Sequence, residues 1–396
     1  MVEISQDIYW IGVNDRETHL FESIIPIPNG VSYNAYMIID EKIALIDSVK
    51  VDFNDSYLDT IKKKLGEKKV DYIIINHMEP DHSGSILALI EAYPDIQIIG
   101  NKITAKYLEG FYGITENILL VKDNESISLG KHTLRFVMTP MLHWPETMMT
   151  YEITTKALFS GDAFGGFGAL NGGVFDDEVN FEFYEDEMRR YYSNIIGKYG
   201  HMVQKAYKKL ETLEIKTIAS THGLVWRDNP QKAIALYDRW SKQKGEDGVV
   251  IVYGSMYGFT KNIADKLARS FAELGIKNIR VYDSARTHAS YILSDIWRYN
   301  TLVLGSSTYN GGMFPPMENV VRKIESSDIK NKNIGVFGTH SWSGESVGLL
   351  SEVSKKSGMQ YIEPAIKHIH AANDQTEDNC KILAANMVAA MKNMAH

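Results

Sequence analysis

The chain has 396 residues, a length that suits two or three domains better than one. Hydrophobic residues make up 44% and charged residues 23%, which is typical of globular proteins and excludes disorder as the main state. The net charge of −8 argues against a nucleic-acid-binding protein, and the single cysteine, Cys380, excludes disulfides within the chain, zinc fingers and cysteine-ligated iron centres.

The first half of the chain predicts a mixed α/β domain. Residues 33–47 predict a hairpin, and the apolar run 70–76 predicts a buried strand. Further strands are predicted at 96–100, 134–138, 156–160 and 216–220, and helices at 55–66, 84–92, 103–111 and 185–212.

Four of these predicted strands lead into residues of the types that bind metal ions. The strand at 70–76 continues into HMEPDHSG, and the strands at 134–138, 156–160 and 216–220 lead to later candidates. Alternate side chains of an extended segment point the same way, so His77, Glu79 and Asp81 are expected to converge on one cavity. The full set of predicted metal ligands is His77, Glu79, Asp81, His143, Asp162 and His222.

The charged segment 241–248 ends in glycine and precedes an apolar strand, so we place the domain boundary there. The first domain then covers 1–246 and the second 247–396. The second domain alternates helical patterns with strands predicted at 249–254, 279–283, 301–307, 333–339 and 361–369. This alternation predicts a doubly wound parallel sheet of five strands.

Three loops follow the first, third and fourth of these strands, at the sheet edge where such folds bind ligands. The first is of the type S-x-x-G-x-T at a helix N-terminus, which suits a phosphate group, and it resembles the flavodoxin phosphate loop. The loops after the third and fourth strands each place glycine and an aromatic residue at the same sheet edge. The candidate residues are Ser255, Met256, Tyr257, Gly258, Phe259 and Thr260, then Ser307, Thr308, Tyr309, Asn310, Gly311 and Gly312, and finally Thr339, His340, Ser341, Trp342, Ser343 and Gly344. A single phosphate cradle and the absence of G-x-G-x-x-G favour FMN over a dinucleotide.

The spacing H-x-E-x-D-H at 77–82 resembles the H-x-H-x-D-H of the metallo-β-lactamase superfamily, an αββα sandwich with a two-metal site. Glu79 stands where that superfamily has its second histidine, and a site richer in carboxylates suits a pair of irons. An N-terminal domain of this kind, followed by a flavodoxin-like domain, resembles the flavodiiron family along the whole chain.

The resemblance implies an oxidoreductase that passes electrons from an external donor, rubredoxin or a reduced deazaflavin, through FMN to a diiron centre. It would reduce dioxygen to water, nitric oxide to nitrous oxide, or both. Dioxygen takes four electrons, which two irons and one FMN hold together. The resemblance further implies a head-to-tail homodimer or a dimer of dimers, in which Trp144 is a candidate to contact the partner's flavin.

Matched positions imply that His77, Glu79 and His143 hold one iron. Asp81 and His222 would hold the other, and Asp162 would bridge the two. His82 matches a position beside the metals that usually does not ligate them. His19 and Tyr191 resemble residues that line the substrate pocket, although Tyr192 is an alternative to Tyr191.

Two other functions stay open: a dizinc hydrolase with a regulatory flavodoxin domain, and a pure electron carrier. Glu79 argues against the first and the complete ligand set against the second. The sequence predicts no signal peptide and no membrane-spanning helix, so a cytoplasmic protein without a membrane partner is expected. Cys380 is expected to be an inert, packed residue.

Overall fold

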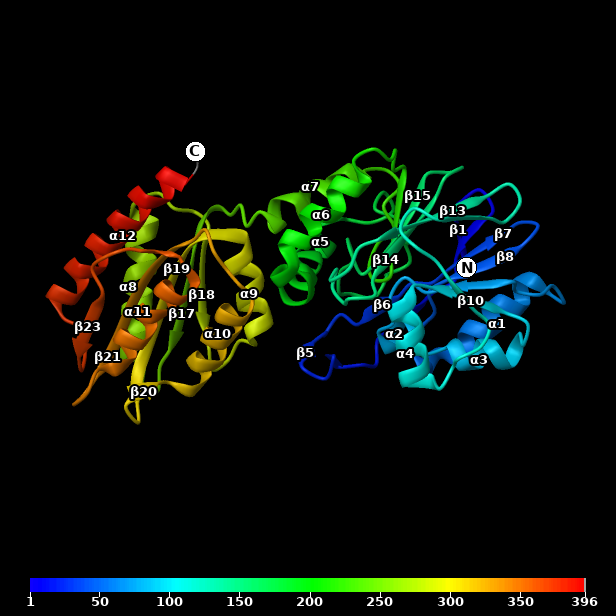
Figure 1. Cartoon of the computed structure of the whole chain (residues 1–396). Helices are drawn as coiled ribbons and strands as arrows, with labels where there is room; N and C mark the ends of the chain where they lie inside the picture. Colours follow the sequence, from blue (N-terminus) through cyan, green and yellow to red (C-terminus); the bar gives the residue numbers. More distant parts are fainter. Residues whose placement is uncertain (395–396) are drawn as a thin grey trace. The chain divides into compact units, whose positions relative to one another are not determined.

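The structure is a computed structural model that describes residues 1–394, and the chain divides into two compact units, Met1–Asp238 and Arg239–His396. The division falls within helix α7 (Pro230–Ser241), ahead of the segment 241–248. Figure 1 shows the elements of each unit in sequence colours.

The first unit is built on two sheets that face one apolar core. The first sheet consists of β1 (Val2–Ser5), β2 (Ile8–Trp10), β7 (Tyr36–Ile39), β8 (Ile43–Ile46), β9 (Tyr72–Ile74), β10 (Gln97–Gly100) and β11 (Ile118–Leu120), in that spatial order. The second consists of β12 (Ser126–Ser128), β13 (Thr133–Met138), β14 (Met148–Glu152), β15 (Ala157–Gly161) and β16 (Thr217–Ser220). Ile38, Ile46 and Ile74 of the first sheet share one buried cluster with Phe136 and Phe159 of the second. The predicted αββα sandwich is confirmed.

Helices and two small hairpins complete this unit. The hairpins pair β3 (Val13–Asp15) with β6 (Val31–Tyr33) and β4 (Leu20–Phe21) with β5 (Ile25–Pro26). The helices are a 3₁₀ turn at Val51–Phe53, α1 (Asn54–Leu65), α2 (Pro80–Ser83), α3 (Ile86–Ala92), α4 (Lys102–Tyr112), α5 (Glu182–Tyr191), α6 (Gly200–Leu210) and α7.

The single helix predicted at 185–212 is wrong, because the structure interrupts it. Between α5 and α6 lie a π-helical turn, Tyr192–Ile196, and a 3₁₀ turn, Gly197–Tyr199. Gly197 begins the second turn and Gly200 follows it, and glycine weakens a helix interior. The sequence analysis also missed β14, a fully buried strand next to the ligand-bearing loops.

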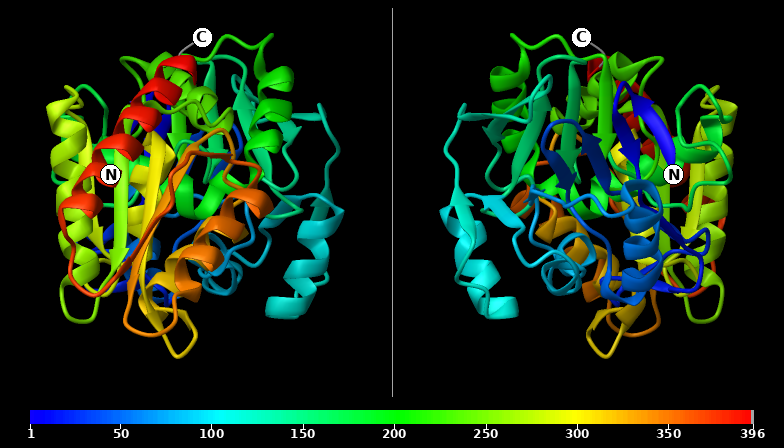
Figure 2. Two further views of the ribbon diagram at one scale, coloured as in Figure 1. Left: turned by 90° about the vertical axis from the view of Figure 1, so that its left-hand side faces the viewer. Right: turned by 90° about the vertical axis from the view of Figure 1, so that its right-hand side faces the viewer.

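The second unit has the strand order β18 (Ile279–Asp283), β17 (Glu246–Gly254), β19 (Tyr299–Tyr309), β21 (Asn333–His340) and β22 (Gln360–Tyr361), which is the flavodoxin order. Helices α8 (Phe259–Glu273) and α12 (Asp374–Met394) pack together against the sheet. Figure 2 shows α12, in red, beside α8. Helices α9 (Ala289–Arg298), α10 (Pro315–Ser326) and α11 (Glu345–Ser357) form a second contacting group. The predicted doubly wound parallel sheet is confirmed.

One predicted strand of this unit, 361–369, is two short strands in the structure. Besides β22, the segment contains β23 (Ile366–Ile369), which pairs with the end of β21, and β20 (Gly312–Met313) pairs with β19. Pro364 lies between β22 and β23, and proline has no N–H to donate to a sheet ladder, so the strand is interrupted there.

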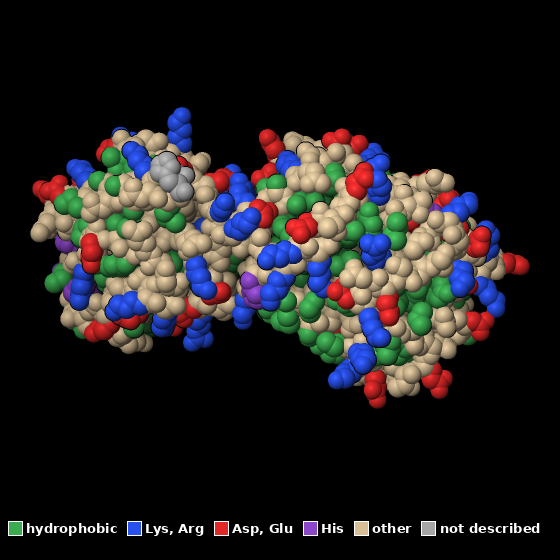
Figure 3. All heavy atoms as spheres, turned by 45° about the horizontal axis from the view of Figure 1, so that its top comes forward, with side chains coloured by type: hydrophobic (Ala, Val, Ile, Leu, Met, Phe, Trp, Pro, Cys, Tyr) green, Lys and Arg blue, Asp and Glu red, His purple; other side chains and the backbone are tan. Residues whose placement is uncertain are grey.

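Three further predictions can be compared with the structure: those on membrane-spanning helices, on the distribution of charge and on Cys380. Within residues 1–394, no helix combines the length and the apolar character needed to cross a membrane. On the face drawn in Figure 3, acidic and basic side chains are interspersed, without a continuous basic stripe. Cys380 is fully buried in α12, and burial raises the pKa of its thiol to about 12, which keeps it unreactive.

Candidate functional site

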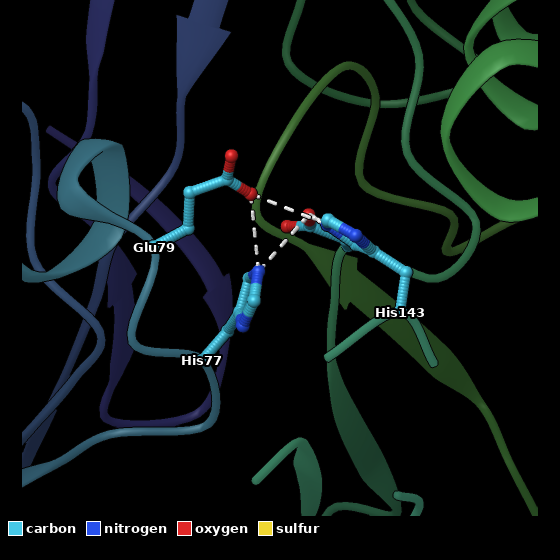
Figure 4. A group of neighbouring side chains, drawn as sticks. His77, Glu79 and His143 are labelled. Atoms are coloured by element: carbon cyan, nitrogen blue, oxygen red, sulfur yellow. Dashed lines mark hydrogen bonds and ion pairs between the residues drawn. The ribbon is translucent and has the colours of Figure 1, made fainter. Parts of the chain in front are cut away.

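A first group of ligand-type side chains meets at the edge of the two sheets in the first unit. The loop after β9 carries His77 and Glu79, the loop before β14 carries His143, and Asp162 follows β15 directly. Glu79 Oε2 lies 3.2 Å from Nε2 of His77 and 3.2 Å from Nε2 of His143 (Figure 4). One ligand atom from each of the four residues lies within 4.8 Å of all the others, so the group could hold a metal ion.

A second group consists of Asp81, His82 and His222. Nε2 of His82 and Nε2 of His222 lie 3.0 Å apart, and Asp81 Oδ2 is 3.4 Å from each. Neither oxygen of Asp81 accepts a hydrogen bond from residues 1–394. A buried carboxylate left in this state is costly, and a cation between these three residues would satisfy it.

Asp162 connects the two groups through its two oxygens. Oδ2 lies 3.1 Å from Nε2 of His143 in the first group, and Oδ1 lies 3.0 Å from Nε2 of His82 in the second. Oδ1 also accepts a hydrogen bond of 2.5 Å from the Thr221 hydroxyl, which fixes the carboxylate. A carboxylate that faces two ligand groups in this way suits two neighbouring metal ions.

Two of the histidines are oriented by hydrogen bonds from their other ring nitrogen. His77 Nδ1 lies 2.8 Å from Oε1 of Glu146, a fully buried carboxylate that also accepts the backbone N–H of Met78. His222 Nδ1 lies 2.8 Å from the carbonyl oxygen of Ser32. Each bond places the proton on Nδ1 and leaves the Nε2 lone pair pointing into the site, as metal-binding histidines require.

The charges of the two groups are strongly coupled. Burial alone would lower the pKa of His143, but Asp162 and Glu79 outweigh burial and raise it to about 9. Burial would likewise lower the pKa of His82, which Asp81 and Asp162 raise to about 9. The carboxylates therefore favour positive charge at this place, and a metal ion that binds here displaces protons.

The reason given for the convergence of His77, Glu79 and Asp81, an extended chain, is wrong, although Glu79 and Asp81 line one cavity. The chain is not extended through the motif, because Pro80 starts the helical turn α2. This turn separates Asp81 and His82 from the first group and directs them to the second. Position His82, expected beside the metals, therefore lies within the second group.

The residues expected to line a substrate pocket are placed differently from one another. Tyr191 is fully buried with its ring 5.3 Å from that of His222, whereas Tyr192 packs on Tyr237. Burial and then Asp162 raise the pKa of Tyr191 well above its usual range, so the phenol stays protonated. His19 is exposed and contributes no side chain to either ligand group.

A cavity of about 600 Å³ opens onto the ligand groups and is lined in part by Glu79, Asp81 and Glu22. Burial, and then the charges of Glu79 and its neighbours, raise the pKa of Glu22 to about 7. The sequence analysis missed Glu22, which lies in a β-hairpin turn without a motif, and Glu146, which follows His143 by three positions.

The second unit contains a pocket of about 330 Å³ at the carboxyl ends of its strands. It is lined by most of the predicted flavin residues: Ser255, Met256, Tyr257, Phe259, Thr260, Ser307, Thr308, Tyr309, Asn310, Thr339, His340, Ser341, Trp342 and Ser343. The predicted glycines Gly258, Gly311, Gly312 and Gly344 do not line it but shape the same loops, and Gly258 has φ +90° directly before α8. His370 also lines the pocket and was not predicted.

The pocket suits FMN. The N-terminus of α8 and the Ser255 and Thr260 hydroxyls lie at one end, where a phosphate group would be stabilised. The rings of Tyr309 and Trp342 lie in the other two loops and remain exposed. The hydroxyl oxygen of Ser307 is buried without a partner among residues 1–394, as expected of a group that bonds a ligand.

Comparisons with known proteins agree with both predicted domains. A family model described as ODP family beta lactamase matches residues 31–223, and a flavodoxin model matches residues 251–383. The anaerobic nitric oxide reductase flavorubredoxin of Escherichia coli O1:K1 is 33% identical over 365 residues, which cover 91% of this chain and 76% of the relative.

Solved structures match over the whole chain. Rubredoxin oxygen:oxidoreductase from Desulfovibrio gigas has a TM-score of 0.95 at 31% sequence identity. The alignment covers 100% of this chain and 99% of that protein. The flavodiiron protein from Giardia intestinalis has a TM-score of 0.93 at 29% sequence identity, and the alignment covers 99% of this chain and 98% of that protein. The order of the two domains, the identity to named relatives and these structural matches show that the chain belongs to the flavodiiron family, whose cofactors are FMN and a diiron centre.

Proposed function

We propose that this protein takes electrons from an external donor through FMN to a diiron centre, and reduces dioxygen to water, nitric oxide to nitrous oxide, or both. The observation that carries the proposal is Asp162, whose two oxygens face two separate groups of His and carboxylate ligands. When bound, the irons and FMN supply the redox chemistry, because together they hold the four electrons that dioxygen needs.

In this proposal His77, Glu79 and His143 hold one iron, Asp81 and His222 hold the other, and Asp162 bridges them. The first group offers four protein ligands and the second three, fewer than the six that iron commonly takes, so positions would stay open for a small gas molecule. Glu79 in place of a histidine makes the site more anionic, which favours ferric over zinc ions. His82 lies in the second group with its Nε2 3.0 Å from Asp162 Oδ1, and in this proposal it supports the ligands without holding the iron itself.

Proton and substrate handling fall to residues beside the ligands. Tyr191 keeps its phenolic proton and faces Asp162, so it can donate a hydrogen bond to a bound gas molecule. Glu22 lines the cavity through which solvent reaches the ligand groups, a place suited to proton entry. His19 is exposed and outside both groups, and we assign it no direct role.

We further propose a head-to-tail homodimer, or a dimer of such dimers, in which the flavin pocket of one copy faces the ligand cavity of the other. Exposed aromatic rings surround the flavin pocket: Trp342 is 88% exposed and Tyr257 83%. Exposed aliphatic side chains also line the ligand cavity, with Leu87 at 51%. Apolar surfaces of this kind mark interaction sites. The electron donor would be a rubredoxin, which the name of the Desulfovibrio gigas protein includes, or a reduced deazaflavin.

The first experiment is elemental analysis of the purified protein, combined with gas uptake under a reducing donor. We expect about two irons and one FMN per chain, and consumption of dioxygen, nitric oxide or both. About two zincs per chain after growth with ample iron, without gas uptake, would instead support the dizinc hydrolase.

A further inference from the structure

Two oxidisable rings connect the first ligand group to the surface of the first unit. The Trp144 ring meets the ring of His77 edge-on, with centroids 5.1 Å apart, and the Tyr107 ring lies 6.1 Å beyond Trp144. Tyr107 stacks on Phe111 at 5.6 Å, and Phe111 is 50% exposed. His77 itself is only 1% exposed, so the rings lead from the buried site outward.

The backbone that carries each ring is fixed by hydrogen bonds. The carbonyl of Trp144 accepts hydrogen bonds from the Met141 N–H and the Thr147 hydroxyl, which fix the loop between β13 and β14. Tyr107 lies on α4, a helix whose start is closed by a capping box at Asn101 and Thr104. The fold therefore sets the positions from which the two rings make their edge-on contact.

Two other oxidisable rings, Tyr33 and Tyr191, contact the ligand residue His222, and neither has such an exit through its ring neighbours. Tyr33 is 2% exposed, and its ring lies 5.8 Å from that of His222 and 6.0 Å from that of Phe53. Tyr191 is fully buried, and its ring neighbours are His222, Phe21 and Phe167. Phenylalanine rings are far harder to oxidise by one electron than indole or phenol. An electron can therefore enter from the surface through Tyr107 and Trp144, whereas Tyr191 has no oxidisable neighbour of this kind among the rings it contacts.

The proposed function creates a need for such electrons. Conversion of dioxygen to two waters takes four electrons and four protons, and two ferrous ions supply only two of the electrons. If dioxygen arrives while the flavin is oxidised, two electrons reduce it only to hydrogen peroxide, which would damage side chains beside the site. Completing the reduction to two waters then takes two electrons from the protein.

We infer that Trp144 and Tyr107 are a protective electron-donating pair, an inference that rests on the proposed function. Each ring gives one electron, and the indole N–H and the phenol O–H each release one proton, so two neutral radicals remain. With two electrons from the irons and two further protons from water, dioxygen becomes two waters. The external donor then returns one electron to each ring, and solvent returns one proton.

The test compares holoenzyme preloaded with two electrons per chain and with four, mixed with dioxygen and frozen rapidly for electron paramagnetic resonance. We expect an organic radical in the two-electron sample and none in the four-electron sample. Trp144→Phe should lose the radical, and Tyr107→Phe should leave a tryptophan radical alone. Peptide mass spectrometry should then find more oxidation of other side chains in Trp144→Phe.

Tyr9→Phe is the matched control, because Tyr9 is a half-buried tyrosine on β2 that makes no ring contact with a ligand residue. Iron and FMN contents are measured for every variant, and radical yield is expressed per dioxygen consumed. The proposed role of the pair would be overturned if the two-electron enzyme consumed dioxygen without forming an organic radical. It would also be overturned if the radical yield were unchanged in both Trp144→Phe and Tyr107→Phe. Absence of uptake of either gas by the four-electron enzyme would overturn the proposed function itself.

Discussion

His82 and His222 present their Nε2 atoms to each other across 3.0 Å, but only one of the two rings is anchored. Nδ1 of His222 is bonded to the Ser32 carbonyl, whereas Nδ1 of His82 has no hydrogen-bond partner among residues 1–394. An anchored ring keeps its tautomer and orientation when a metal leaves, and an unanchored ring does not. The second metal position is therefore built on one fixed and one adjustable histidine.

This asymmetry predicts unequal effects of two substitutions. His222→Ala should remove the second metal, while His82→Ala should weaken its retention by a smaller factor, about 10- to 100-fold, comparable to loss of a supporting residue. Both variants should keep the first metal. Iron per chain after dialysis against a graded series of chelator concentrations measures this, and equal losses in the two variants would contradict it.

Asp162 offers a sharper test of the two-metal arrangement. Asp162→Ala removes oxygens from both groups at once and leaves several histidines without their charge partner, so both metals should be lost. Thr221→Val is the matched control, because it removes the 2.5 Å hydrogen bond to Asp162 but keeps the carboxylate. The control should keep both irons. Full iron content and activity in Asp162→Ala would show that the residue does not bridge.

Glu79→His tests the choice of metal. The substitution removes a carboxylate that lies 3.2 Å from two histidine nitrogens and makes the first group less anionic. We expect lower iron retention and loss of gas reduction with FMN still bound, because the flavin pocket contains no residue of the first unit. Iron, zinc and FMN per chain, together with gas uptake, measure the effect. Wild-type turnover in Glu79→His would contradict the assignment of Glu79 as a ligand.

Trp342 is expected to contribute to flavin binding through ring contact. Trp342→Ala should weaken FMN binding roughly 2- to 10-fold, since an aromatic ring contact is worth about 0.5–1.5 kcal/mol. Recovery of flavin fluorescence on dilution gives the dissociation constant. Trp297→Phe in the same unit is the control, because that ring is buried away from the pocket lining. An unchanged constant in Trp342→Ala would exclude this role.

Much of the site could be predicted because its ligands follow strands directly. Asp162 comes immediately after β15, and His222 follows β16 by two positions, so the strand pattern alone brought them to one edge. The division into two groups could not be predicted the same way, because it depends on the helical turn at Pro80. The resemblance to the family, rather than the strand pattern, placed Asp81 with His222 and apart from His77 and Glu79.

Residues that support the ligands were harder to find than the ligands. Glu146 and Ser32 act through hydrogen bonds to His77 and His222, and nothing in their local sequence distinguishes them from other polar residues. Only the packing of β14 and β6 beside the ligand loops brings them there. The fold class, in contrast, depends on repeated apolar strands such as β17 and β21, which are visible as continuous runs.

The second unit contains a buried lysine whose chemistry gives a pH-dependent prediction. Lys332 is 2% exposed, and its amine donates to the carbonyl oxygens of Tyr299 at 2.7 Å and Trp297 at 3.4 Å. Within residues 1–394, no carboxylate lies within ion-pair distance of it. A protonated amine has three N–H groups and a charge to satisfy, so burial lowers its pKa from 10.5 to about 7.

Lys332 should therefore destabilise the folded protein most at low pH. Below about pH 7 the amine is charged in the folded and unfolded states, and the full cost of burying the charge applies. Between about 7 and 10.5 only the unfolded state holds the extra proton, so the free energy of unfolding rises with pH, by at most about 1.4 kcal/mol per pH unit. Above 10.5 the penalty is gone.

Lys332→Met should remove this dependence and stabilise the second unit most at pH 6.5, with a gain that shrinks steadily toward pH 10. Lys330→Met is the matched control, because Lys330 is exposed and paired with Asp328 at 2.9 Å, and its loss should change stability little at any pH. The measurement is urea unfolding followed by flavin release at pH 6.5, 8 and 9.5. A gain of the same size at all three values would show that the wild-type amine does not lose its proton on folding. In that case the destabilisation would come from packing, and the methionine would act by filling the space around the Tyr299 and Trp297 carbonyls.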